Sequence, residues 1–172
     1  TAWVAHTLPD GLSSYVSLVS LQTNSVKAVI PLLLVNPRNV DQVQDDPVPV
    51  PEGGYILIRG HIAIPPGSGD LWVPCQYHNF LNQTMTAEST IQAAVHKINL
   101  TTLEHYVDNR VVLTALYAHL AADSTLVGDG WNAHIAGPID VAFSADGATA
   151  YLVNNNSNDV VVVPPTITPA KP

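Results

Sequence analysis

A strand–turn–strand pattern that recurs along the chain constrains its fold more than any other feature. The clearest copy is GPIDVAFSADGATAYLVNNNSNDVVVV, residues 137–163. It begins with alternating apolar residues (139–143), a Ser-Ala-Asp-Gly turn (144–147) and a second apolar run (150–153). An Asn-rich turn (154–159) and four valines (160–163) follow. Two-residue periodicity bounded by Asp-Gly and Asn-Ser clusters is typical of an antiparallel meander. The valine run has no polar alternation, which predicts a strand covered on both faces.

The stretch GHIAIPPGSGDLWV, residues 60–73, repeats the first part of this pattern. Trp72 aligns with Tyr151, and Ile64 with Phe143, both at an offset of 79 residues without a gap. The alignment predicts a strand at 61–64, a turn at 65–70 and a second strand at 71–73. A third strand is expected at 91–100 and a fourth around 105–113.

The N-terminal residues contain another copy. Residues 2–5 match 71–74, which places Trp3 and Trp72 at equivalent positions and predicts that both pack in the core. Two further strands, 15–21 and 26–31, flank a Gln-Thr-Asn-Ser turn. The chain 1–172 is therefore one segment of three copies of a four-stranded unit. The first copy, 1–31, lacks its first strand, the second is 55–113, and the third, 137–172, has no evident last strand. Loops 32–54 and 114–136 connect the copies.

The stretches YVSLVSLQTNSVKAVIPL and VAFSADGATAYLVNNNSNDVVVV resemble the repeats of YVTN-type β-propeller proteins. The resemblance implies an all-β fold of propeller blades, each a four-stranded antiparallel meander. A closed ring takes about 4–8 blades, so three copies imply an incomplete ring that needs further blades from the same or another chain. Without them, two apolar faces would be exposed. The alternative is a small β-sandwich in which the repeats are coincidental.

Charge and composition exclude several classes of protein. The chain has 6 Lys and Arg against 14 Asp and Glu, a net charge of -8. Nucleic acids and anionic membranes bind basic surfaces, so neither is an expected partner. No apolar stretch of about 18 residues is present, which argues against a membrane span. The single Cys75 excludes an intrachain disulfide.

Several histidines fall at one end of the predicted meanders. His6, Cys75 and His78 follow second strands, and Asn154 holds the matching place in the third copy. Imidazole nitrogens bind copper or zinc, which predicts a metal or redox-partner site formed by His6, His61, Cys75, His78 and His134. The alternative is that these histidines bond to loop backbone and that Cys75 is a small buried apolar residue. Trp131, in a Gly-Asp-Gly-Trp-Asn loop, and Asn154 are candidate ligand contacts.

These observations favour a non-catalytic propeller segment that serves as a scaffold or binding surface in a larger exported assembly. The alternative function is part of a periplasmic redox enzyme that binds copper, or docks a haem partner, through the histidines. A third possibility is glycan or peptide binding through Trp131. The sequence contains no GxSxG, HExxH, P-loop or GxGxxG motif, so whether the protein is an enzyme stays open. Low charge and the resemblance favour a periplasmic, cell-surface or secreted location.

Overall fold

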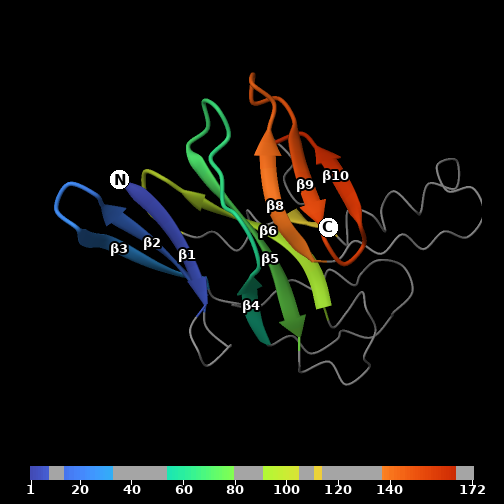
Figure 1. The fold of residues 1–172 in the computed structure, drawn as a ribbon, viewed down its shortest axis with the longest axis horizontal. Helices are drawn as coiled ribbons and strands as arrows, with labels where there is room; N and C mark the ends of the chain where they lie inside the picture. The colour runs from blue at the N-terminus through green and yellow to red at the C-terminus, as the bar shows by residue number, and fades with distance from the viewer. Residues whose placement is uncertain (8–13, 33–53, 80–90, 105–110, 114–136, 166–172) are drawn as a thin grey trace, which may run out of the picture.

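The computed structural model describes residues 1–7, 14–32, 54–79, 91–104, 111–113 and 137–165. Within these ranges the protein is all-β, as expected, and its ten described elements are strands (Figure 1). They are β1 (Ala2–Thr7), β2 (Ser14–Ser20), β3 (Ser25–Leu32), β4 (Gly54–Ile58), β5 (Asp70–Asn79), β6 (Ile91–Asn99), β7 (Val111–Val112), β8 (Pro138–Phe143), β9 (Ala150–Asn154) and β10 (Asp159–Val163).

The strands form three antiparallel sheets in which neighbours in space are also neighbours in sequence. Sheet A has the order β1-β2-β3, sheet B the order β4-β5-β6-β7, and sheet C the order β8-β9-β10. The meanders predicted for the N-terminal residues and for 137–163 are confirmed, with one β-bulge at Leu18 and Val19 in sheet A. The third strand predicted at 91–100 is also confirmed, as β6.

The first strand of sheet B is not where the alignment placed it. It is β4, Gly54–Ile58, which pairs with the second half of β5. The predicted strand 61–64 is reduced to one bridge, in which Ala63 N donates to Trp72 O (3.1 Å) and Trp72 N to Ala63 O (2.8 Å). Between the two, His61 N donates to Ile139 O at 3.0 Å. The chain leaves the edge of sheet B there because its backbone bonds to sheet C instead.

The second strand of sheet B is longer than expected, since β5 continues through Pro74 to Asn79. Proline lacks the N–H that a strand uses to bond its neighbour. Trp72 N points toward the β4 side of the sheet, so the nitrogen of Pro74 points the same way. On that side of Pro74 the segment after β4 has left β5, since His61 bonds to Ile139 instead. No ladder bond is therefore lost at Pro74, and the strand continues through it.

The fourth strand of sheet B, predicted around 105–113, is described only as the short β7, opposite Ala94 and Val95. Residues 105–110 lie outside the described residues.

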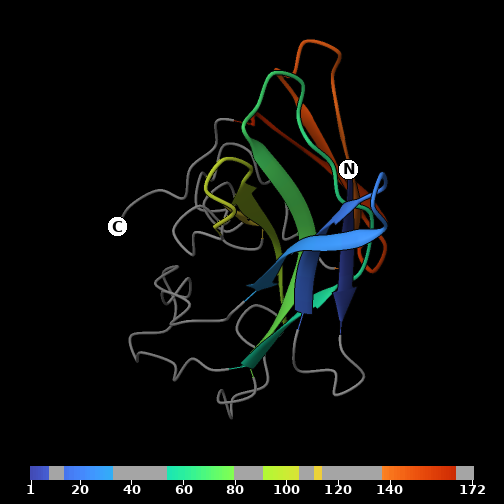
Figure 2. The same ribbon diagram turned by 90° about the vertical axis from the view of Figure 1, so that its left-hand side faces the viewer.

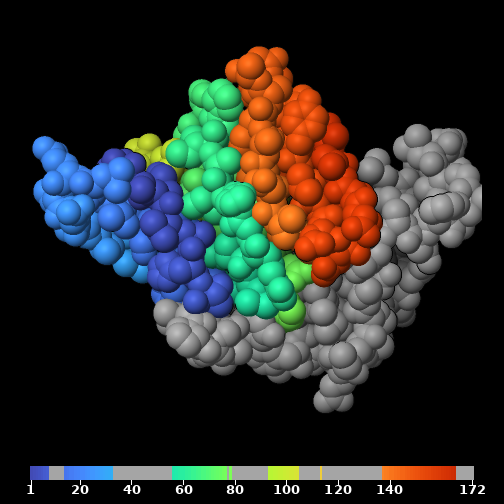
Figure 3. Space-filling model, in the orientation of Figure 1, coloured from blue at the N-terminus to red at the C-terminus, as the bar shows by residue number. Residues whose placement is uncertain are grey.

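Sheet B lies between the other two sheets (Figures 1 and 3), and sheet A lies in front of it in Figure 2. Successive side chains of a strand point to opposite faces. One face of sheet B packs on sheet A, in a cluster that includes Val16, Ile30, Leu32, Ile56, Leu71, Val73, Cys75, Ala94 and Ile98. The other packs on sheet C, in a cluster of Trp72, Ala93, Val95, Leu113, Val141, Ala150, Leu152 and Val163. Burying one such Val or Leu side chain contributes about 1.5–3 kcal/mol, so the two clusters hold the three sheets together.

The backbone contact between sheets B and C leaves no room for a side chain at Gly60. A Cβ on Gly60 would lie 1.5 Å from the carbonyl oxygen of Ile139. We expect Gly60→Ala to lower the free energy of unfolding by about 1–3 kcal/mol, because β8 would have to shift away from sheet B. Urea unfolding measures this. Gly69→Ala is the control, because a Cβ there meets no atom within 4 Å. Equal destabilisation by the two substitutions would contradict the close approach.

Candidate functional site

Trp3, Trp72 and Tyr151 occupy one repeated position on the second strand of the repeat. Trp72 is opposite Ala63, and Tyr151 is opposite Ala142, so the strand pairings keep the 79-residue offset seen in the sequence. We call the face of a sheet that points to the next sheet along the chain its forward face, and the opposite face its rear face. All three aromatic residues lie on forward faces. Trp3 packs toward sheet B and Trp72 toward sheet C. The neighbours of Tyr151 on β9 pack toward sheet B, so Tyr151 points away from sheet B, which is the forward direction for sheet C.

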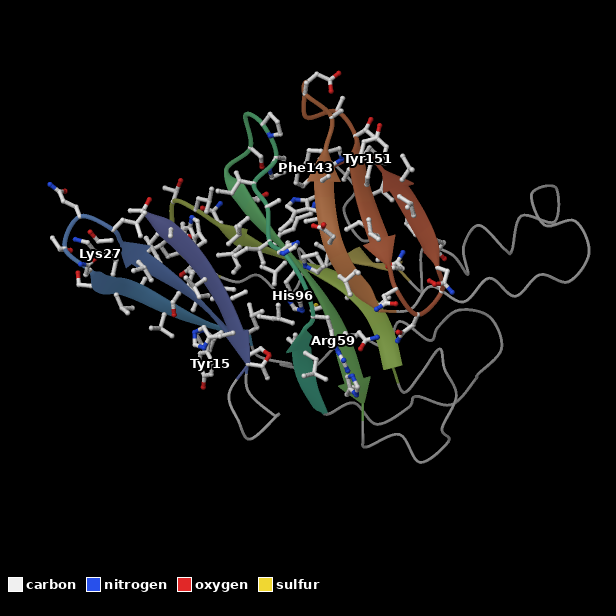
Figure 4. The ribbon with its side chains drawn as sticks, viewed as in Figure 1. Tyr15, Lys27, Arg59, His96, Phe143 and Tyr151 are labelled. Carbon is white, nitrogen blue, oxygen red and sulfur yellow. The ribbon has the colours of Figure 1, made fainter. Side chains whose placement is uncertain are left out.

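The surroundings of this aromatic position differ between sheets B and C. Trp72 is only 1% exposed and meets the Phe143 ring edge-on, with centroids 5.2 Å apart. Tyr151 is 40% exposed, because no described sheet covers the forward face of sheet C. Figure 4 labels Phe143 and Tyr151 at the upper end of that sheet.

The residue after each of these aromatic residues lies on a rear face, and its exposure is highest in sheet A and not in sheet C. Val73 in sheet B and Leu152 in sheet C are completely buried, whereas the equivalent Val4 in sheet A is 45% exposed. Sheets B and C are each covered from behind by the preceding sheet, and no described sheet covers sheet A from behind. The three-sheet stack therefore ends in an open rear face at sheet A and an open forward face at sheet C.

Both open faces carry exposed apolar side chains. The open face of sheet C carries the exposed side chains of Tyr151, Val153, Val160 and Val162, which form cross-strand pairs. The open face of sheet A carries Val4, Val26 and Val29, all exposed. The prediction that the valine run is covered on both faces is wrong within this chain. Val161 and Val163 pack toward sheet B, and their two neighbours face outward.

His6, the first predicted metal ligand, lies on the open face of sheet A. It is opposite Tyr15 in the β1–β2 pair, and their rings stack with centroids 5.6 Å apart. Its Nε2 is 3.0 Å from the Ser17 hydroxyl. The sheet itself therefore satisfies this imidazole.

Cys75 and His78 lie within β5 and not in a loop after it, which corrects the sequence-based placement. The Cys75 side chain is completely buried, faces sheet A and donates a weak hydrogen bond to Ala94 O at 3.6 Å. Sheet A stands between this thiol and the face that carries His6. Stacked sheets are about 10 Å apart, so His6 and Cys75 do not converge on one ion.

His61 lies beside sheet C, and the Nδ1 of its exposed ring is 3.4 Å from Asp140 Oδ2, a contact that is an ion pair when the imidazole is protonated. Among the residues that the structure describes, no three His, Cys, Asp or Glu side chains are grouped so that they could hold a metal ion. His134 and Trp131 lie outside the described residues. A metal site that includes His134, and a ligand contact at Trp131, stay predictions.

Asn154, the candidate ligand contact, is buried at the end of β9. Its Nδ2 donates to Asp159 Oδ1 at 2.7 Å, which joins the two ends of the turn between β9 and β10. In the described fold this side chain closes a turn.

Lys97, on β6, is a buried cation that the sequence analysis did not single out. Its Nζ lies 4.6 Å from the centroid of the Trp72 ring and donates to Pro165 O at 3.0 Å. Burial lowers the pKa of Lys97, partly opposed by the charge of Asp70. Its position opposite Trp72 in the ladder is the signal that could have identified it, once the register of β5 and β6 was known.

The exposed valines were also missed as functional residues. The signal was present, because β10 keeps valines at both inward and outward positions where a sheet with one solvated face usually alternates apolar and polar residues.

The fold and these faces define an all-β protein of stacked antiparallel sheets whose two outer faces carry exposed apolar side chains. Comparison with protein-family models, with curated protein sequences and with solved structures gave no match. Among the described residues, no helix is long and apolar enough to cross a membrane.

His78 predicts a pH dependence of stability. Burial, and secondarily the charge of Arg59, lower its pKa below the usual value of 6.5. The unfolded chain then binds more protons than the folded chain just below pH 6.5, so stability falls from there down to the lowered pKa. We expect His78→Gln to flatten the decline in unfolding free energy on acidification from pH 7. Urea titrations at several pH values measure it, with His61→Gln as the control for removal of an exposed imidazole. An unchanged slope in His78→Gln would contradict the prediction.

Proposed function

We propose that this chain is a non-catalytic scaffold built of β-propeller blades, and that its two open sheet faces bind further β-sheets of a larger assembly. The observation that carries the proposal is the set of matched positions. Val73 and Leu152 are buried under a preceding sheet, and the equivalent Val4 has the same apolar character but is 45% exposed, with no described sheet over it. Trp72 lies under a following sheet, and the equivalent Tyr151 does not.

The chemistry of the open faces supports a binding role. An antiparallel sheet that faces water usually alternates apolar residues inward with polar residues outward. Strand β10 places Val160 and Val162 outward, at 54% and 59% exposure. Contiguous apolar patches on a folded protein mark interaction surfaces. A face of this kind gains free energy only when another apolar surface covers it.

The proposed architecture also explains the order of the sheets. Each sheet is a meander whose strands follow chain order, and the three sheets stack face to face in the order A, B, C. A propeller ring uses this same stacking repeatedly and then closes. The redox function and the exported location stay predictions of the sequence.

A matched pair of substitutions tests whether the open faces serve binding and not folding. Val→Thr keeps the shape of the side chain and adds a hydroxyl. Val73→Thr should lower the free energy of unfolding by about 1–3 kcal/mol, because the hydroxyl is buried. Val4→Thr, at the same repeat position, should change it by less than about 0.5 kcal/mol.

Urea unfolding at several chain concentrations, extrapolated to low concentration, removes any contribution from association between chains. An equal cost at the two positions in that limit would mean that sheet A is already covered within the folded chain. The proposed function would then be wrong.

A further inference from the structure

We infer that Lys97 determines which sheet packs on the forward face of sheet B. Its buried ammonium favours sheet C, whose chain brings the carbonyl oxygen of Pro165, over an apolar surface that offers no such acceptor. The inference concerns an interface inside the described fold, and it holds whatever covers the two outer faces.

Lys97 occupies a repeated position of the fold. It is the cross-strand partner of Trp72 in the β5–β6 pair. At the equivalent position sheet A has Leu18 and sheet C has Val162, each opposite its own aromatic residue. Cross-strand partners share one face of a sheet, so all three side chains lie on forward faces. Of the three sheets, only sheet B carries a charge at this position.

The ammonium of Lys97 is buried where sheet C packs on sheet B. The residue is only 6% exposed, and its Nζ lies 4.6 Å from the centroid of the Trp72 ring. The same Nζ donates to Pro165 O at 3.0 Å. Strand β10 ends at Val163, so Pro165 is the second residue beyond sheet C. The chain of sheet C therefore supplies an acceptor to a charge that belongs to sheet B.

The energetics of a buried charge make this acceptor selective. Burial lowers the pKa of Lys97 below its ordinary value, with the charge of Asp70 acting in the opposite direction, so the folded surroundings disfavour the charged form. The Pro165 carbonyl and the Trp72 ring offset part of that cost in the native arrangement. A surface that packed here without the carbonyl would leave the buried charge less compensated, which is strongly destabilising. The difference between the two arrangements favours sheet C.

The chain needs such a selection because its sheets present similar apolar surfaces. Val160 and Val162 on sheet C, and Val26 and Val29 on sheet A, are all more than half exposed. Apolar burial has no directional preference, so it does not distinguish these faces from the rear face of sheet C as a cover for sheet B. One cation that requires one acceptor does distinguish them.

The experiment compares Lys97→Met with Lys27→Met. Methionine keeps an unbranched side chain and removes the charge. Lys27 is exposed on β3, so its substitution removes the same charge away from the interface. Urea unfolding measures stability, and the indole N–H signals in a proton–nitrogen NMR spectrum report how uniquely the sheets pack. The chain has three Trp residues, and Trp72→Phe identifies the signal of Trp72.

We expect the urea midpoint of Lys97→Met to equal or exceed that of the unaltered chain, because replacing buried ionic groups by apolar residues of similar size is often neutral or stabilising. We also expect the Trp72 signal of this variant to broaden or to split, because sheet C then packs on sheet B in more than one way. Lys27→Met should change neither the midpoint nor the signal.

Two outcomes would overturn the inference. A lower urea midpoint in Lys97→Met, up to failure to fold, would mean that Lys97 stabilises the interface and does not select it. One sharp Trp72 signal at an unchanged or higher midpoint would mean that the charge selects nothing. Neither outcome bears on the proposed binding role of the outer faces, which the Val4 and Val73 substitutions test.

Discussion

The fold depends on the burial of sheet B on both of its faces. Trp72 and Val73 are neighbours on β5, yet one is buried against sheet C and the other against sheet A. A sheet covered on both faces buries successive residues of its central strands. In β5 and β6 most of these are apolar, and the buried polar residues among them are Gln76, His96 and Lys97. Sheets A and C are held in place by one face each. The arrangement of the three described sheets, with a covered centre and two open outer faces, follows from this single constraint.

A backbone contact complements the apolar packing. The bond from His61 N to Ile139 O joins the edge of sheet B to β8 of sheet C. It accounts for three features together: the absence of a side chain at Gly60, the interruption of the first strand of sheet B, and the tolerance of Pro74 in the middle of β5. A proline nitrogen is acceptable there because the neighbouring chain has turned away to make this bond.

Much of the fold was predictable from local pattern. The alternation of Ile139, Val141 and Phe143, followed by an Asp-Gly turn, predicted β8 and its connection to β9 because two-residue periodicity and turn residues are local properties. The position of β4 was not predictable, because the alignment matched 61–64 to β8 and the departure of the chain toward Ile139 is a contact between distant residues. The candidate metal site was predicted from positions at strand ends, but whether side chains at equivalent positions meet depends on which sheets stand between them. His6 and Cys75 hold equivalent positions on different sheets, and sheet A separates them.

The sequence by itself determined the strand order within each meander and the apolar character of both faces of β10, because each depends on residues close together in the chain. It also determined the repeat offset of 79 residues, because the copies share one local pattern. Only the tertiary structure decided which apolar residues are covered. Val4 and Val73 are the same residue type at the same repeat position, and their exposure differs because sheet B has a preceding sheet and sheet A has none described. Burial depends on the neighbouring sheet, which lies tens of residues away along the chain.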